Sequence, residues 1–251
     1  MAVSIKSARE IEMMREAGRL LAEVHEELGK ALKPGMSTLE VDILGERLIR
    51  ERDCIPNFLH YNGYPASICV SVNEEVVHGI PSKRRILKEG DIVSLDAGLI
   101  YKGYHSDAAR TYAIGETTPE VKKLIEETRN SFFEGIKMAK AGNHLYDISN
   151  AIDAYISQFG YGIVRDLVGH GIGTSLHEDP QIPNFKQERR GLKLQPGMTL
   201  AIEPMINLGR CDVVVLDDDW TVVAEDGLPS AHYENTILIT DGEPEILTML
   251  K

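Results

Sequence analysis

Apolar residues recur at the spacing of a helix face near the start of the chain. Ile11, Met14, Gly18 and Leu21 follow one another in steps of three or four residues, which is the period of an amphipathic helix. Helices are predicted at residues 7–31, 37–52, 118–140 and 145–159. Strands are predicted in the apolar runs ASICVSV, DIVSLDAGLIY, MTLAIEPMI and NTILIT. Helices grouped beside strands favour an α+β fold over alternating βαβ units.

The chain also repeats itself. LKPGMSTLEV (32–41) matches AKAGNHLYDI, and LKEGDIVSLDAG (87–98) matches LQPGMTLAIEPM, both at a shift of 107 residues. The second match sets Asp96 over Glu203, one acid over another. A duplicated fold commonly places its chemistry where the halves meet, so acids from both halves are candidates for one site. We expect a single domain, 1–251, made of two similar halves at about 1–115 and 116–251.

Composition excludes several classes of protein. A net charge of −12 argues against a general binder of DNA or RNA, because neutralising phosphates requires a basic surface. No run of 18 apolar residues offers a membrane span, and the early charges do not fit a signal peptide. Cys54, Cys69 and Cys211 show no paired spacing, which fits a reducing compartment. We therefore expect a cytoplasmic monomer that binds neither DNA nor membranes.

Two aspartates flank a short predicted hairpin. If the turn is Tyr101-Lys102, Asp96 pairs directly with Asp107, and if it is Lys102-Gly103 they are diagonal neighbours. Side chains alternate along strands, so both registers place the two carboxylates on one face. Two like charges in apolar surroundings are costly unless a cation lies between them. The alternative is that each aspartate is an ordinary edge or turn residue.

Two glutamates and a histidine extend this set. Glu203 ends the apolar run of LAIEPM, and Glu234 precedes that of HYENTILIT. Alone, each would be interpreted as a strand-end carboxylate facing water. Together with Asp96, Asp107 and His170 they form a plausible ligand set for two divalent ions, and the imidazole favours Mn, Fe, Co or Zn over Ca or Mg. Paired metals of this kind promote hydrolysis.

The stretch VGHGIGTSLHEDP (168–180) contains two of the eight histidines, His170 and His177. Its glycines follow neither the dinucleotide-binding nor the P-loop spacing, so a phosphate-binding loop is not predicted. We interpret Gly171 as a position where the backbone must approach the metals closely.

Six motifs resemble those of the type I methionine aminopeptidases, and they span nearly the whole chain. They are NEEVVHGIP (73–81), GDIVSLDAG (90–98), HSDAARTY (105–112), GHGIGTSLHEDPQIPN (169–184), PGMTLAIEPM (196–205) and SAHYENTILIT (230–240). The resemblance implies the pseudo-twofold "pita-bread" α+β fold, an antiparallel-rich curved sheet covered by helices. It also implies metal-dependent removal of the initiator methionine from nascent proteins and peptides, with preference for a small second residue.

The resemblance assigns a role to each metal-ligand candidate. Asp96 is expected to hold one ion with both carboxylate oxygens. His170 and Glu203 are expected to bind the other ion, while Asp107 and Glu234 bridge the two. Two divalent ions per chain are implied, drawn from Co, Mn, Fe and Zn.

The same resemblance implies roles in catalysis and substrate binding. His78 and His177 are expected to hydrogen-bond the peptide and stabilise the tetrahedral intermediate, with Glu203 as the proton shuttle. Without it, His78 would be interpreted as a turn residue and Trp220 as a packing residue. Leu176 and Phe58 differ from common family patterns, which affects the expected pocket shape. The methionine pocket is expected to comprise Phe58, Tyr61, Tyr64, Cys69, Leu176 and Trp220.

Two other functions remain open. A proline-specific aminopeptidase or dipeptidase shares the fold but usually carries an additional N-terminal domain. A non-catalytic binding protein of this fold would have lost metal ligands, and all five are present here.

Basic clusters offer one partner hypothesis. They could guide an otherwise acidic enzyme to ribosomal RNA near the exit of the nascent chain, and the alternative is that they are ordinary solvated loops. The cluster residues are Lys83, Arg84, Arg85, Lys186, Arg189 and Arg190.

Overall fold

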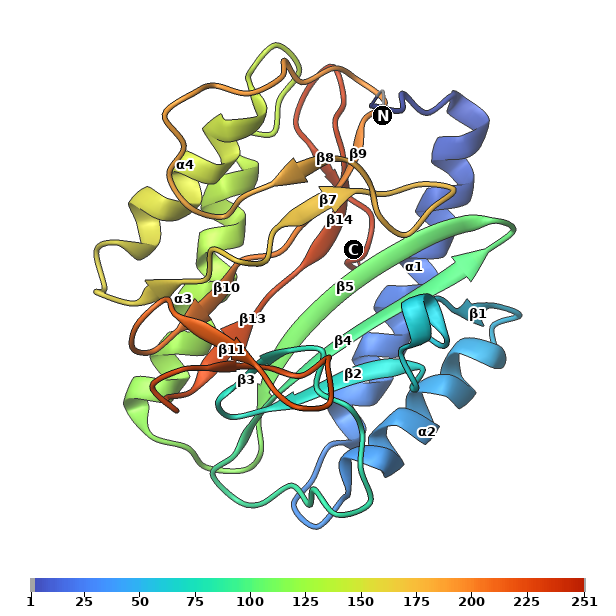
Figure 1. The fold of residues 1–251 in the computed structure, drawn as a ribbon. Helices are drawn as coiled ribbons and strands as arrows, with labels where there is room; N and C mark the ends of the chain where they lie inside the picture. The colour runs from blue at the N-terminus through green and yellow to red at the C-terminus, as the bar shows by residue number, and fades with distance from the viewer. Residues whose placement is uncertain (1–2, 251) are drawn as a thin grey trace.

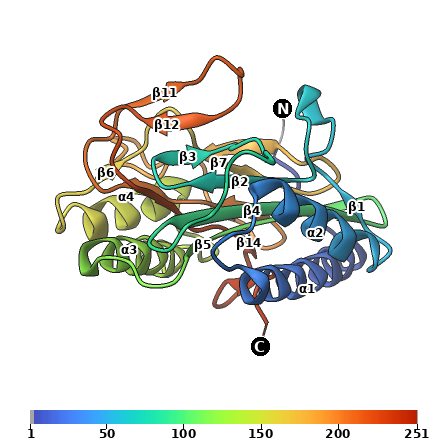
Figure 2. The ribbon, with the colours of Figure 1, turned by 90° about the horizontal axis from the view of Figure 1, so that it is seen from below.

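The long helices lie together on one side of the strands in the computed structural model, which describes residues 3–250 (Figure 2). They are α1 (Ala8–Ala31), α2 (Thr38–Arg50), α3 (Pro119–Ile136) and α4 (Leu145–Ile156). All four predicted helices are confirmed, although α3 and α4 end three or four residues earlier than predicted. In both cases the chain turns before a glycine with positive φ, Gly142 at 93° and Gly160 at 74°.

Local side-chain chemistry fixes where the first two helices begin. Ser7 and Ser37 each accept a hydrogen bond from the backbone N–H three residues later, at 3.5 and 3.2 Å. In return, Glu10 and Glu40 accept a bond from the backbone N–H of those serines, each at 2.7 Å. These reciprocal capping boxes satisfy N–H groups that a helix start leaves unpaired.

Within residues 3–250 the strands form four antiparallel groups, and most of these strands are labelled in Figure 1. The first contains β1 (Ile55–Pro56), β4 (Ile92–Tyr101) and β2 (Ile68–Val72), with β5 (Tyr104–Ala113) paired to β4. The second runs β15 (Glu245–Ile246), β14 (Asn235–Leu238), β9 (Thr199–Ile202), β7 (Gly169–Gly171) and β8 (Glu178–Ile182). Two smaller groups are β13 (Ser230–His232), β10 (Met205–Asn207) and β6 (Gly162–Ile163), and β11 (Val213–Val215), β12 (Val222–Ala224) and β3 (Glu75–Val77). The short 3₁₀ helix η1 spans Tyr61–Gly63.

The 107-residue repeat of the sequence holds in three dimensions. An isolated β-bridge joins Ser37 to Ile86, and a second joins His144 to Lys193, exactly one repeat further along both segments. The shift also relates glycines with φ near +90°, Gly35 to Gly142 and Gly90 to Gly197. Because glycine tolerates this left-handed conformation, the same turn is built at the same place in each half.

Each helix pair packs its apolar face on its own strands. Leu21 of α1 and Val41 of α2 join Leu95 of β4 in one buried cluster. Phe132 of α3 and Leu200 of β9 belong to another. On α1 the predicted apolar face is confirmed at Met14, Gly18 and Leu21, which are buried, as expected because apolar burial is the main term that stabilises a fold.

The two halves meet along β5 and β14. Ala109 and Glu234 exchange two backbone hydrogen bonds, at 3.4 and 3.0 Å. Thr236 Oγ1 also accepts from the N–H of Asp107 and donates to its carbonyl, at 3.1 and 2.9 Å. This junction fixes acids from both halves beside one another. Within residues 3–250, no helix combines the length and the apolar character needed to span a bilayer.

Candidate functional site

The β4–β5 hairpin places two aspartates on one face. Its turn is Lys102-Gly103, with φ of 48° and 86°, and positive φ at both positions suits the twist of a two-residue hairpin. Gly98 pairs with Asp107, and Asp96 pairs with Ala109. The two aspartates are therefore diagonal neighbours, the second of the two predicted registers.

A break between two strands positions the glutamates. Strand β9 pairs with β14 up to Ile202–Asn235, and pairing resumes between β10 and β13 at Met205–His232. Glu203 and Glu234 lie within this gap, beside one another across the ladder. The side-chain amide of Asn184 donates to the backbone carbonyl of Glu203 at 3.0 Å and holds the break in place.

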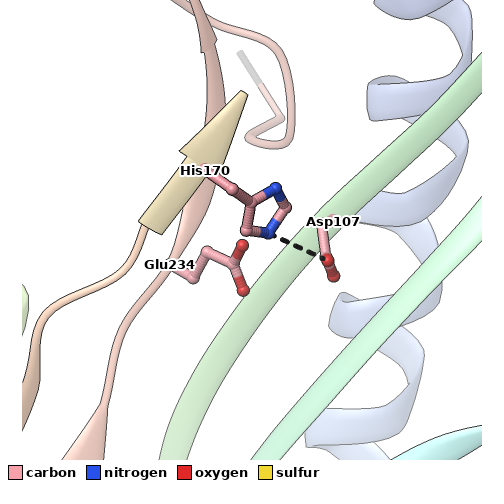
Figure 3. Close-up of side chains that lie close together, drawn as sticks. All are labelled: Asp107, His170 and Glu234. Atoms are coloured by element: carbon pink, nitrogen blue, oxygen red, sulfur yellow. Dashed lines mark ion pairs between the residues drawn. The ribbon is translucent and has the colours of Figure 1, made fainter. Parts of the chain in front are cut away.

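His170 projects from β7 toward Asp107 and Glu234, as Figure 3 shows. Its Nδ1–H donates to the carbonyl of Gly171 at 2.9 Å, because a carbonyl can only accept. The neutral ring therefore presents the lone pair of Nε2, which lies 3.9 Å from Oδ2 of Asp107 and 3.6 Å from Oε1 of Glu203. A cation between this unprotonated nitrogen and the carboxylates would satisfy both.

The charges within this cluster are not compensated by the protein. Burial raises the pKa of Asp96 to about 7, and burial followed by neighbouring carboxylates raises the pKa of Asp107 well above its usual value. Burial lowers the pKa of His170 to about 3, so it stays neutral. Among the described residues, one carboxylate oxygen each of Asp96, Asp107 and Glu234 is buried without a hydrogen-bond partner.

The donor set therefore fits divalent cations. Asp107, His170 and Glu234 offer ligand atoms within 4.8 Å of one another, as expected for a metal site. The nearby Arg110 directs hydrogen bonds to the backbone carbonyls of Ala109 and Glu234 rather than to the carboxylates. No cationic side chain among these residues takes the place of an ion.

One cavity of about 280 Å³ brings all the predicted site residues together. Phe58, Tyr64, Cys69 and Leu176 are buried in its walls. The ring of Trp220 lies edge-on to that of Tyr64, with centroids 5.1 Å apart. The remaining cavity residues among those predicted are Tyr61, His78, Asp96, Asp107, His170, His177, Glu203 and Glu234.

The two histidines predicted to bind substrate, His78 and His177, both line this cavity. Nδ1 of His177 is 2.8 Å from the hydroxyl of Tyr61, and its ring centroid is 4.3 Å from that of His170. His78 has a φ of 59° and stands edge-on to Trp220 at 6.1 Å. Burial lowers the pKa of His78 to about 4.

The interpretation of Gly171 was wrong in its cause. A Cβ at this position would lie 2.2 Å from the backbone carbonyl oxygen of Asp179 on the neighbouring strand. The glycine is needed because β7 and β8 approach closely, at a register shift after His170. This strand contact explains the glycine without reference to an ion.

Two features of the site were not predicted. His232 lines the cavity, and its Nε2 lies 3.9 Å from Oε2 of Glu203. The sequence signal was its position two residues before Glu234, because alternate side chains of an extended segment share a face. The second feature is an ion pair of 2.6 Å between Lys6 and Glu178, the residue after His177.

Comparison with known proteins identifies the family. The sequence model of Metallopeptidase family M24 matches residues 12–241. A methionine aminopeptidase of Clostridium acetobutylicum is 54% identical over 247 residues, which cover 98% of this chain and 99% of that protein.

Solved structures agree with this result. The crystal structure of methionine aminopeptidase from Thermotoga maritima superimposes with a TM-score of 0.97 at 46% identity, covering 99% of this chain and 100% of that one. An Xaa-Pro dipeptidase from Bacillus anthracis gives 0.79 at 26% identity, covering 98% of this chain but only 62% of that one. The shared pita-bread fold and the near-complete match of both lengths lead to one conclusion: the chain belongs to the methionine aminopeptidases of metallopeptidase family M24.

Proposed function

We propose that this enzyme removes the N-terminal methionine from nascent proteins and peptides by metal-dependent hydrolysis. The observation that carries the proposal is a cluster of four acids and one buried imidazole at a largely apolar cavity, with Asp107 and Glu234 buried and Asp96 and Glu203 half-buried. The full-length identity to methionine aminopeptidases supports the reaction. The match to proline-specific relatives is weaker, and it covers less than two thirds of the Xaa-Pro dipeptidase chain.

Five side chains would hold two divalent ions: Asp96, Asp107, His170, Glu203 and Glu234. Their unpaired buried oxygens and the Nε2 lone pair of His170 support this assignment. When bound, such ions lower the pKa of water and polarise a carbonyl. The imidazole favours Mn, Fe, Co or Zn. Asp96 would serve one ion, His170 and Glu203 the other, and Asp107 and Glu234 both.

Glu203 is the proposed proton carrier. Burial and then the charge of Asp96 raise the pKa of its carboxyl well above the usual value, so the carboxylate takes up a proton more readily than an exposed glutamate does. Glu203 would accept a proton from the attacking water and deliver it to the leaving amine. Its backbone, fixed by Asn184, keeps the carboxylate in reach of the cavity.

His177 and His78 would bind the scissile peptide. With the Tyr61 hydroxyl donating to Nδ1 of His177, Nε2 of that ring carries the proton and can donate to the carbonyl oxygen as negative charge develops there. His78 lines the cavity beside Trp220 and would also donate to the peptide.

The methionine side chain would enter the apolar part of the cavity. Its proposed walls pair aromatic rings with the thiol of Cys69 and the buried Leu176, and the thioether of methionine packs well against such rings. The second residue of the substrate would pass the exposed pair of Tyr61 and His177, which favours a small side chain. The proposed pocket residues are Phe58, Tyr61, Tyr64, Cys69, Leu176 and Trp220.

A short peptide series tests the substrate. The metal-loaded enzyme is expected to release methionine from Met-Ala-Ser, to act poorly on Met-Phe-Ser, and to leave Pro-Ala-Ser and N-acetyl-Met-Ala-Ser intact. The acetylated peptide tests the need for a free amine with the side chain unchanged. Release of proline in preference to methionine would instead support the proline-specific alternative.

We further propose that the enzyme works in the cytoplasm as a monomer of one domain, 1–251, with halves at about 1–115 and 116–251. All three cysteines are free thiols, as a reducing compartment favours. The hydrogen bonds between Ala109 and Glu234 tie the halves at the site itself, which supports one folding unit.

Transient ribosome association is also proposed, through one basic cluster at a time. The loops that contain Lys83–Arg85 and Lys186–Arg190 lie at opposite ends of the molecule in Figure 1. Arg85 and Arg190 already pair with Glu74 and Asp147, at 3.7 and 3.0 Å, so Lys83, Arg84, Lys186 and Arg189 would contribute most. Reversing the charges of each cluster separately should reduce co-sedimentation with ribosomes at low salt; unchanged binding in both variants would rule out the association.

A further inference from the structure

His232 is held rigidly at the edge of the proposed metal cluster. Its backbone N–H donates to Oγ1 of Thr111 at 2.8 Å, and that hydroxyl donates to its carbonyl at 2.9 Å. The residue closes β13 and pairs with Met205, at the resumption of the ladder after Glu203. The contacts with Thr111 of β5 and Met205 of β10 therefore fix His232, close to where Glu203 precedes β10.

The imidazole of His232 is buried without a hydrogen bond at Nε2. The side chain is 2% exposed, and Nε2 has no hydrogen-bond partner within residues 3–250. Buried polar atoms are nearly always paired, so an unpaired one calls for a specific partner. Oε2 of Glu203 lies 3.9 Å from this nitrogen, which is longer than a hydrogen bond. The two atoms must therefore come closer before Nε2 can donate to Oε2.

The two oxygens of Glu203 face two different imidazoles. Oε1 lies 3.6 Å from Nε2 of His170, and Oε2 lies 3.9 Å from Nε2 of His232. The His170 nitrogen has no proton to share, because Nδ1 of that ring donates to the Gly171 carbonyl. A cation would satisfy the Oε1 side, whereas an N–H donor is sufficient on the Oε2 side.

We propose that His232 is a positioning residue for Glu203: its Nε2–H donates to Oε2 and leaves Oε1 as the single oxygen that binds the ion. This inference rests on the proposed metal site and adds a residue that the ligand set does not contain. Partners that orient a metal ligand are expected to affect metal affinity and geometry more than substrate affinity. A group that binds substrate directly would act on KM instead.

The test compares two substitutions in the full-length protein. His232→Leu fills a similar space without a donor, while His232→Gln retains an N–H at similar reach. Metal-free samples are titrated with Co²⁺, and both the dissociation constant and the visible Co²⁺ absorption spectrum are recorded. KM for Met-Ala-Ser is measured at saturating Co²⁺, and thermal melts of the metal-free variants report on folding.

His232→Leu should weaken Co²⁺ binding by roughly 10- to 100-fold and alter the absorption spectrum, with little change in KM. His232→Gln should recover most of the affinity and a spectrum close to that of the unsubstituted protein. Unchanged affinity and spectrum in the leucine variant would overturn the inference. So would a glutamine variant as weak as leucine, which would make the imidazole itself a ligand, or a rise in KM alone. Failure of the unsubstituted protein to bind Co²⁺ would instead reject the proposed metal site.

Discussion

At the scale of single residues, the environment of Glu203 combines burial, neighbouring charge and a fixed backbone. Burial is the first cause that raises the pKa of its carboxyl, and the charge of Asp96 adds to it. Binding an ion and carrying a proton both require the charge of the carboxylate as well as its shape. Replacing Glu203 by the isosteric glutamine removes the charge and keeps the shape, so it separates these two contributions.

We expect Glu203→Gln to lower kcat for Met-Ala-Ser by roughly 10²- to 10⁴-fold, the usual contribution of a general base. The fold should persist, because the backbone contact with Asn184 does not involve the side chain of Glu203. Glu225→Gln, which disturbs only an exposed pair with Arg210, serves as the control. A Glu203→Gln enzyme with near-normal turnover would remove Glu203 from its role.

Patterns in the sequence predicted the placement of the acids better than the residues that contact them. Alternation along strands placed Asp96 and Asp107 on one face in either register, and the structure confirms that shared face. The choice of register depended on positive φ at Lys102, a residue type that rarely adopts it. His232 was missed because its significance lies in an unpaired nitrogen, which only three-dimensional packing reveals.

At the scale of elements, a buried ion pair anchors the loop that presents His177. Nζ of Lys6 lies 2.6 Å from Glu178, and the other carboxylate oxygen of Glu178 accepts from the N–H of Ser175 at 3.2 Å. The segment before α1 is thereby tied to the turn between β7 and β8. The ion pair therefore anchors the loop that carries His177, in the wall of the cavity, to the N-terminal segment.

Removing one partner of this pair should matter more than removing an exposed one. We expect Lys6→Met to lower the free energy of unfolding by about 3 kcal/mol, because Glu178 is left largely buried and unpaired. It should also lower kcat/KM by roughly 10-fold through a misplaced His177. Lys30→Met, which breaks the exposed pair with Glu26 on α1, should change either quantity little. Equal effects of the two substitutions on the free energy of unfolding and on kcat/KM would contradict the anchoring role of the Lys6–Glu178 pair.

Sequence patterns located the helices but not the way the second half's strands divide. The run MTLAIEPMI was predicted to be strand-like, with its apolar part ending at Glu203, and the structure forms a separate strand, β10, after Pro204. Proline cannot donate to a ladder, so the run breaks there. The pairing of each piece with a different partner, β14 and β13, depends on long-range contacts that local patterns do not contain.

At the scale of the whole molecule, stability should depend on pH and metal together. Burial raises the pKa of Asp96 from 3.8 to about 7 and lowers that of His170 from 6.5 to about 3. Below about pH 6.5 these shifts act in opposite directions on stability. Above it the unfolded histidines lose their remaining protons, and the acids, which bind protons more tightly when folded, dominate the pH dependence.

The metal-free protein should therefore lose stability as pH rises from 6.5 to 8. A bound cation takes the place of the lost protons, so added Mn²⁺ should raise the melting temperature more at pH 8 than at pH 6.5. At 100 times the dissociation constant the gain should be about 5–10 °C. Calorimetric melts at both pH values measure this gain in melting temperature. A gain at pH 8 no greater than that at pH 6.5 would contradict the raised pKa values of the acids.

The most direct measurement of the central claim is methionine release before and after metal is restored. The protein is stripped with chelator, assayed on Met-Ala-Ser, and assayed again after separate addition of Co²⁺, Mn²⁺, Fe²⁺ and Zn²⁺. We predict no release from the stripped protein and recovery with at least one ion. Full activity in the stripped protein, or no methionine released with any of the four, would contradict a metal-dependent methionine aminopeptidase.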